Sequence, residues 1–136
     1  MLQRFSKFFG AAGTISCSNN YNVGMALITL SKNPFFKERK PLAKVLVKMS
    51  NQFHIAASTY SRLASVFYLK IYHSCFNKNP ACKDVTVLNV PKKFVYKQRN
   101  QQDFYSVGAL HLENQPVQLL DSAKKNSRCY LRRFGK

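Results

Sequence analysis

The sequence predicts an α+β fold in which one long amphipathic helix, at about residues 41–76, packs on a small antiparallel β-meander. Two observations carry this prediction: apolar residues recur at helical spacing in the middle of the chain, and the period changes to two after it. Basic extensions complete the expected organisation. We expect a targeting-like segment and connector at 1–40, a small α+β domain at 41–126 and a basic tail at 127–136.

The N-terminal segment has the pattern of a short basic amphipathic helix. Leu2, Phe5 and Phe9 fall on one helical face, and Arg4 and Lys7 lie off it. With no acid in this segment, and with small and hydroxyl residues after it, it resembles a mitochondrial targeting segment. We therefore expect a mitochondrial protein of the matrix. A surface helix or an ordered basic arm is the alternative.

The central helix is expected to begin at Pro41, since proline suits the first helical position. Its apolar stripe, spaced by threes and fours, consists of Leu42, Leu46, Met49, Phe53, Ala56, Tyr60, Leu63, Phe67 and Ile71. Pro80 is expected to terminate it. A transmembrane helix is disfavoured, because Arg62 and Lys70 would place charge within the bilayer.

Three candidate strands follow the helix. Residues 84–90 are rich in β-branched side chains, residues 93–98 alternate, and residues 104–112 supply a third strand. Pro91 and the polar residues 99–103 provide the turns of the meander. A short helix is expected near residues 117–125.

The charge balance is the most unusual property of the 136-residue chain. It has 22 Lys and Arg against 5 Asp and Glu, a formal net charge of +17, and a pI near 10.1. Such an excess favours a polyanionic partner, which relieves the self-repulsion. No glycine-rich phosphate loop and no closely spaced pair of carboxylates occurs. We therefore expect no enzymatic activity, no cofactor and no small-molecule substrate.

The four cysteines leave several interpretations open. Plain thiols are the default, and a Cys75–Cys82 disulfide across the intervening turn is an alternative that requires an oxidising compartment. A zinc site from His73, Cys75, Cys82 and Cys129 departs from the usual close pairing of ligands. We expect no metal.

Basic residues interleaved with aromatic ones provide the candidate binding site. Lysine and arginine neutralise phosphates, and exposed tyrosine stacks on unpaired bases. The residues predicted to contact RNA are Lys92, Lys93, Lys97, Arg99, Lys124, Lys125, Arg128, Tyr130, Arg132 and Arg133. Phe94 and Tyr96 are expected to belong to the core, since aromatic residues in strands are usually buried.

Two functions are compatible with these features. The first is a structural, RNA-contacting component of a mitochondrial ribosome, which binds rRNA and bridges neighbouring proteins of a large assembly. The second is an accessory subunit of an inner-membrane respiratory or ATP synthase complex, whose amphipathic helix contacts partner helices and whose charge meets anionic lipid. Charge spread over both termini favours the first, and the aromatic end of the helix favours the second.

Overall fold

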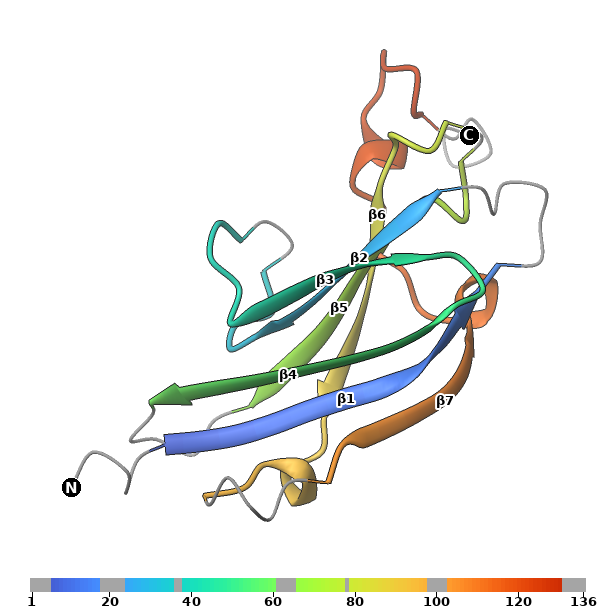
Figure 1. Cartoon of the computed structure of the whole chain (residues 1–136). Helices are drawn as coiled ribbons and strands as arrows, with labels where there is room; N and C mark the ends of the chain where they lie inside the picture. The colour runs from blue at the N-terminus through green and yellow to red at the C-terminus, as the bar shows by residue number, and fades with distance from the viewer. Residues whose placement is uncertain are drawn as a thin grey trace.

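A computed structural model describes residues 6–17, 24–35, 38–60, 66–77, 79–97 and 103–130, and these residues form a β-sandwich (Figure 1). The strands are β1(Ser6–Ser16), β2(Met25–Ser31), β3(Ala43–Lys48), β4(Gln52–Tyr60), β5(Phe67–His73), β6(Asp84–Val90) and β7(Tyr105–His111). One sheet has the order β4-β1-β7 and the other the order β3-β2-β5-β6.

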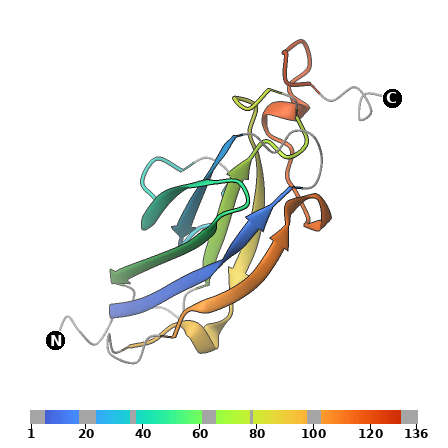
Figure 2. The ribbon, with the colours of Figure 1, turned by 45° about the vertical axis from the view of Figure 1, so that its right-hand side comes forward.

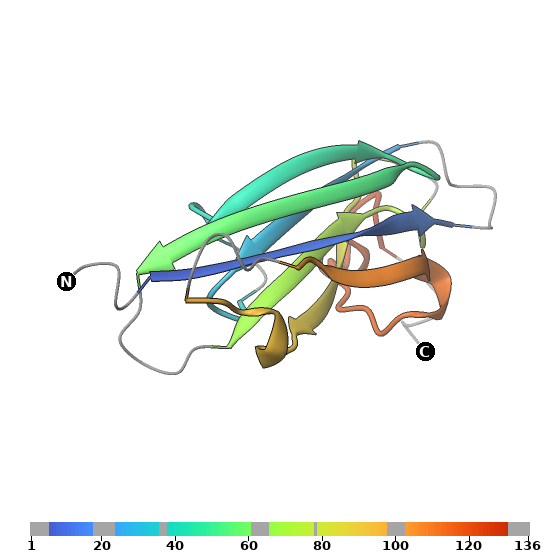
Figure 3. The same cartoon turned by 60° about the horizontal axis from the view of Figure 1, so that its bottom comes forward.

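The central strand of the three-stranded sheet is β1. It pairs with β4 antiparallel and with β7 parallel, so the three strands lie side by side (Figure 2). In the other sheet β2, β5 and β6 pair antiparallel, and β3 forms one edge. The turn after β3 passes from one sheet to the other, because β3 pairs with β2 whereas β4 pairs with β1 (Figure 3).

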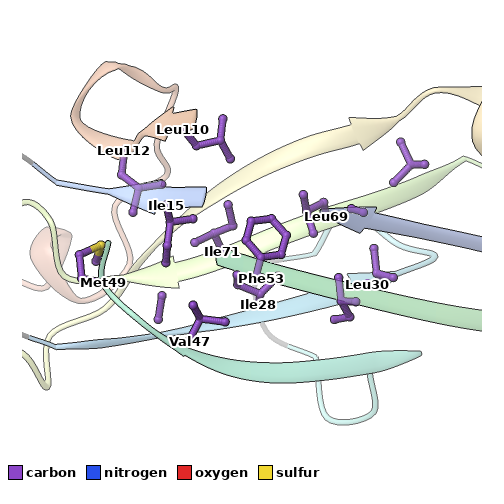
Figure 4. Close-up of a cluster of buried hydrophobic side chains, with 14 of the residues drawn as sticks. Ile15, Ile28, Leu30, Val47, Met49, Phe53, Leu69, Ile71, Leu110 and Leu112 are labelled. Carbon is purple, nitrogen blue, oxygen red and sulfur yellow. The ribbon is translucent and has the colours of Figure 1, made fainter. Parts of the chain in front are cut away.

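The core lies between the two sheets. Every second residue of a strand points to the same side, so β5 directs Phe67, Leu69 and Ile71 inward. The rings of Phe9 and Phe67 stack across the core with centroids 4.2 Å apart. Figure 4 shows the buried cluster, which includes Ile15, Ile28, Leu30, Val47, Phe53, Leu110 and Leu112.

The expected long helix is wrong. Residues 41–76 contain β3, β4 and β5, and the longest helical elements in the described residues are single turns of 3-10 helix. The apolar stripe does not form one buried face, since Leu46 is 63% exposed and Tyr60 is 45% exposed. Burial in β4 instead alternates, with Phe53 and Ile55 inside and His54 outside. The fold class is therefore a sandwich of two sheets, and not α+β.

Other expected elements divide into confirmed and corrected ones. The strand at 84–90 is confirmed as β6, and the one at 104–112 as β7, but the two lie in different sheets and form no meander. The strand at 93–98 is replaced by the 3-10 turn η2(Lys92–Phe94), and the helix near 117–125 by the turn η5(Asp121–Ala123). In place of the expected N-terminal amphipathic helix, the described residues contain β1, which buries Phe9 and Ile15. Leu2, Arg4 and Phe5 lie outside the described residues.

Membrane spanning by a helix finds no support in the described residues, since no helix there has the length and hydropathy to cross a bilayer.

All four cysteines are paired in disulfides, Cys17 with Cys75 and Cys82 with Cys129. The expected default of free thiols and the Cys75–Cys82 alternative are therefore both wrong. The zinc alternative also fails, because the sulfur of Cys75 is bonded to that of Cys17 and the sulfurs of Cys82 and Cys129 are bonded to each other. Cys17 follows β1 and Cys75 follows β5, so the first disulfide joins the two sheets.

The second disulfide fixes the C-terminal segment against the start of β6. The carboxylate of Asp84 accepts hydrogen bonds from the backbone N–H groups of Leu120 and Ser122, at 2.9 and 3.2 Å, and from the Ser122 hydroxyl at 2.7 Å. Gln118 also forms a backbone bridge with Val85. This end of the sandwich is thus closed by polar contacts as well as by the Cys82–Cys129 bond.

Candidate anion-binding surface

The residues predicted to contact RNA do not form one patch. Lys92, Lys93 and Lys97 are exposed at and after η2, beyond the end of β6. The second group, Lys124, Lys125 and Arg128, is exposed after η5, beside the start of β6 (Figure 1). Because the seven residues of β6 separate the groups, they lie roughly 20 Å apart at the ordinary rise of a strand.

The other four residues predicted to contact RNA are one tyrosine and three arginines. Tyr130 is half-buried. Arg99, Arg132 and Arg133 lie outside the described residues. The expected burial of Phe94 is confirmed in part: it is half-buried, packs against the core, and has its ring centroid 5.4 Å from that of Tyr105.

Most of the acidic groups are engaged inside the structure. Asp84 is fully buried against the C-terminal segment, where Leu120 and Ser122 donate hydrogen bonds to it. Asp121 accepts a hydrogen bond from the backbone N–H of Lys83 at 2.8 Å and pairs with Lys124 at 3.0 Å. Glu38 forms an ion pair with the buried Lys70, whose Nζ lies 3.4 Å from Oε1 of Glu38. Of the five acids, Asp103 alone has an exposed side chain, so the outer charge of the described residues is overwhelmingly positive.

A row of basic residues missed as a site by the sequence prediction lies along β3 and the connection before it. We call this the β3 edge: Lys32, Arg39, Lys40, Lys44 and Lys48, all of which are exposed. Lys44, Leu46 and Lys48 alternate with Val45 and Val47, which face the core. The signal is present in the sequence as lysine at both ends of a VLV run, which lies within the region predicted to be a helix at 41–76.

A cavity of about 360 Å³ adjoins the β3 edge on the outer face of the four-stranded sheet. Leu27 and Thr29 of β2 and Tyr72 of β5 form its floor, and Glu38, Arg39 and Pro41 come from the connection between β2 and β3. Burial raises the pKa of the Tyr72 phenol, with a smaller contribution from the nearby negative charge of Glu38. The phenol is therefore neutral throughout the physiological range.

His73 is buried on the inner side of β5, where both of its ring nitrogens contact neighbouring residues. Its Nδ1 accepts a hydrogen bond from the backbone N–H of Cys75 at 3.2 Å, and its Nε2 lies 3.0 Å from the Thr86 hydroxyl. Burial, with a smaller contribution from the positive charge of Lys83, lowers the pKa of His73 to about 4. The ring is thus neutral and fully engaged at neutral pH.

Taken together, these features define the class of protein as a small disulfide-linked β-sandwich with a basic surface. The comparisons with known proteins add no family to this class: no family model matches the chain, and no curated protein matches it.

Proposed function

We propose that this protein is a non-catalytic binding domain that docks on an extended polyanion through the β3 edge. The main observation behind this proposal is that acidic and basic side chains differ in exposure. Four of the five acids are at least half-buried, whereas the five cations of the β3 edge are all exposed. A polymer that neutralises this row gains affinity by releasing its condensed counterions. The exposed Leu46 between Lys44 and Lys48 adds an apolar contact at the centre of the row.

The two disulfides favour an oxidising compartment as the place where this protein works. Disulfides persist in secreted and lumenal proteins and are rare where thiol reductants are active. With Cys17–Cys75 and Cys82–Cys129 both formed, we propose an oxidising compartment. A sulfated polysaccharide is the polyanion whose chemistry suits that setting, since sulfate groups accept charge-assisted hydrogen bonds from lysine and arginine.

The ribosomal assignment remains a prediction, and the same positive charge supports it. Its proposed location in the mitochondrial matrix is harder to combine with two disulfides. A cleaved targeting segment is likewise hard to combine with β1, because removing it would remove the central strand of a sheet. The alternative of an accessory subunit has lost its main support, since the amphipathic helix that was to contact partner helices is a set of strands.

The proposal is tested by measuring binding of the oxidised full chain to fluorescently labelled heparin oligosaccharide and to single-stranded RNA of equal length, over a series of salt concentrations. If five cations contact the polymer, the logarithm of the affinity falls with the logarithm of salt at a slope of about −3.5. The double variant Lys44→Gln, Lys48→Gln should reduce the slope to about −2.

A matched control removes the same charge elsewhere. The variant Lys124→Gln, Lys125→Gln has the same net charge as the β3-edge variant but is changed beside the start of β6, the edge strand opposite β3 in the four-stranded sheet. Equal losses in both variants, or no binding of heparin at low salt, would refute docking at the β3 edge. Tighter binding of RNA than of heparin would instead favour the ribosomal prediction.

A further inference from the structure

The cavity beside the β3 edge has a net positive lining, because its one acidic residue, Glu38, is neutralised by an ion pair. Glu38 would make it anionic, but its carboxylate is engaged: Oε1 contacts the Ser31 hydroxyl and the Lys70 ammonium, and Oε2 accepts a hydrogen bond from the Asn33 amide at 2.9 Å. Lys70 is completely buried and cancels this charge. Arg39 and Lys44, which also line the cavity, are left with a net positive charge.

Lys70 also holds the wall of the cavity in place. Its ammonium donates hydrogen bonds to the Phe35 carbonyl and to Asn33 Oδ1, so the connection between β2 and β3 is tied to the outer face of β5. The cavity is therefore built by buried contacts, and not by a chance gap between surface side chains.

Thr29 supplies the second, independent observation. Its side chain lines the cavity, the residue is 3% exposed, and its Oγ1 has no hydrogen-bond partner among the described residues. On its two sides in the sheet lie Lys44 of β3 and Lys70 of β5. Buried hydroxyl groups in native proteins are almost always hydrogen-bonded, because desolvation without a partner is costly. An unpartnered hydroxyl in a cavity therefore points to a bound ligand with an acceptor atom.

We propose that this cavity binds a small amphipathic carboxylate. The carboxylate would lie toward Lys44 and Arg39 and accept a hydrogen bond from the Thr29 hydroxyl, and the apolar body would contact Leu27 and Pro41. The volume of about 360 Å³ is near the lower end of the range for small-molecule sites. The site suits a single small molecule, whereas the polymer of the proposed function would lie along the exposed row.

The direct test is a titration of the oxidised full chain with decanoate and with decanol, followed by calorimetry. Decanoate should bind saturably at one site and at least tenfold more tightly than decanol, because only decanoate carries the charge. Thr29→Val, which keeps the shape and removes the hydroxyl, should weaken decanoate binding about tenfold to hundredfold, as expected for a lost hydrogen bond to a charged group. Thr29→Ser should retain binding.

Two exposed lysines of one strand face provide the matched control. Lys44→Gln should weaken decanoate binding, whereas Lys48→Gln, which does not line the cavity, should leave it unchanged. Lys48→Gln should nevertheless weaken heparin binding, and Thr29→Val should not, so the two proposals fail separately. Equal binding of decanol and decanoate, an unaffected Thr29→Val variant, or no saturable binding at millimolar decanoate would overturn the assignment.

Discussion

Acidification should destabilise this protein through His73, because the folded chain holds the ring in its neutral form. The N–H of Cys75 donates to Nδ1, so the ring proton resides on Nε2 and is donated to the Thr86 hydroxyl. Protonation of Nδ1 would break the hydrogen bond from Cys75 and place a charge in a buried site. The folded-state pKa is accordingly lowered to about 4 by burial and by the charge of Lys83.

The sign and size of the effect follow from this lowered pKa. In the unfolded chain His73 has the ordinary pKa of about 6.5, so between pH 6.5 and 4 the unfolded state binds a proton that the folded state does not. The free energy of unfolding therefore falls as the pH falls through this window, and the contribution is constant below pH 4. A shift of this size corresponds to about 3 kcal/mol between pH 7 and pH 4.

The measurement is urea unfolding of the oxidised protein at several pH values between 7 and 4, compared with that of His73→Gln. Glutamine does not titrate, so the variant should start less stable at pH 7 and lose about 3 kcal/mol less on acidification. The control His54→Gln changes an exposed histidine of β4 and should keep the full pH dependence. The reasoning is refuted if the stability of wild type and His73→Gln falls in parallel, since the carboxylates common to both would then account for the whole effect.

Three further changes have expected outcomes in stability, each measured by chemical denaturation. Replacing Cys82 and Cys129 by alanine opens a loop with a sequence separation of 47, so the free energy of unfolding should fall by up to about 4 kcal/mol on the loop-entropy model; an unchanged value would show that the bond does not constrain the unfolded chain. Gly13→Ala should cost about 1–3 kcal/mol, because a Cβ there would lie 2.4 Å from Cγ2 of Val107, and Val107→Ala in the same chain should recover part of the loss. Thr29→Val should raise the ligand-free stability by about 1 kcal/mol, since it removes a buried hydroxyl without a partner; a loss of stability would contradict the contact pattern of Thr29.

The strands of the C-terminal half were predictable because their own residues specify them. The run at β6 is rich in β-branched side chains and is closed by Pro91, and β7 contains Tyr105 and Val107, whose residue types favour strands. Local pattern does not, however, say which strands are neighbours. The parallel pairing of β7 with β1 joins residues about 95 positions apart, as in the register of Ile15 with Leu110, and no local signal encodes it.

The helix prediction failed because steps of four and three also arise when several strands follow one another. Phe53 and Phe67 are buried in different sheets, yet their separation in sequence fits a helical stripe. The competing signal was present in the VLV run of β3 and in the alternating FHI of β4. A turn at Ser50, with a positive φ of 73°, separates these runs and allows the chain to cross between the sheets.

The cysteine pairing was beyond sequence reasoning for a different reason. Four cysteines allow three pairings, and spacing alone favours the nearest partners, here Cys75 and Cys82. The sandwich places Cys75 at the end of β5 beside the end of β1, where Cys17 lies, and it places Cys82 beside the C-terminal segment. The disulfides therefore report on tertiary structure, and they alter the interpretation of compartment more than any composition argument does.

Lys70 shows why the cavity had no sequence signal even though the basic row did. A lysine within the apolar run FYLKIY would ordinarily mark a solvent-facing position without a buried acidic partner. In the fold this lysine is buried, because Glu38, Asn33 and the Phe35 carbonyl come from a connection more than thirty residues earlier. That same pairing neutralises Glu38 and so leaves Arg39 and Lys44 to set the charge of the cavity. The preference for an anion thus depends on a buried ion pair that only the folded chain assembles.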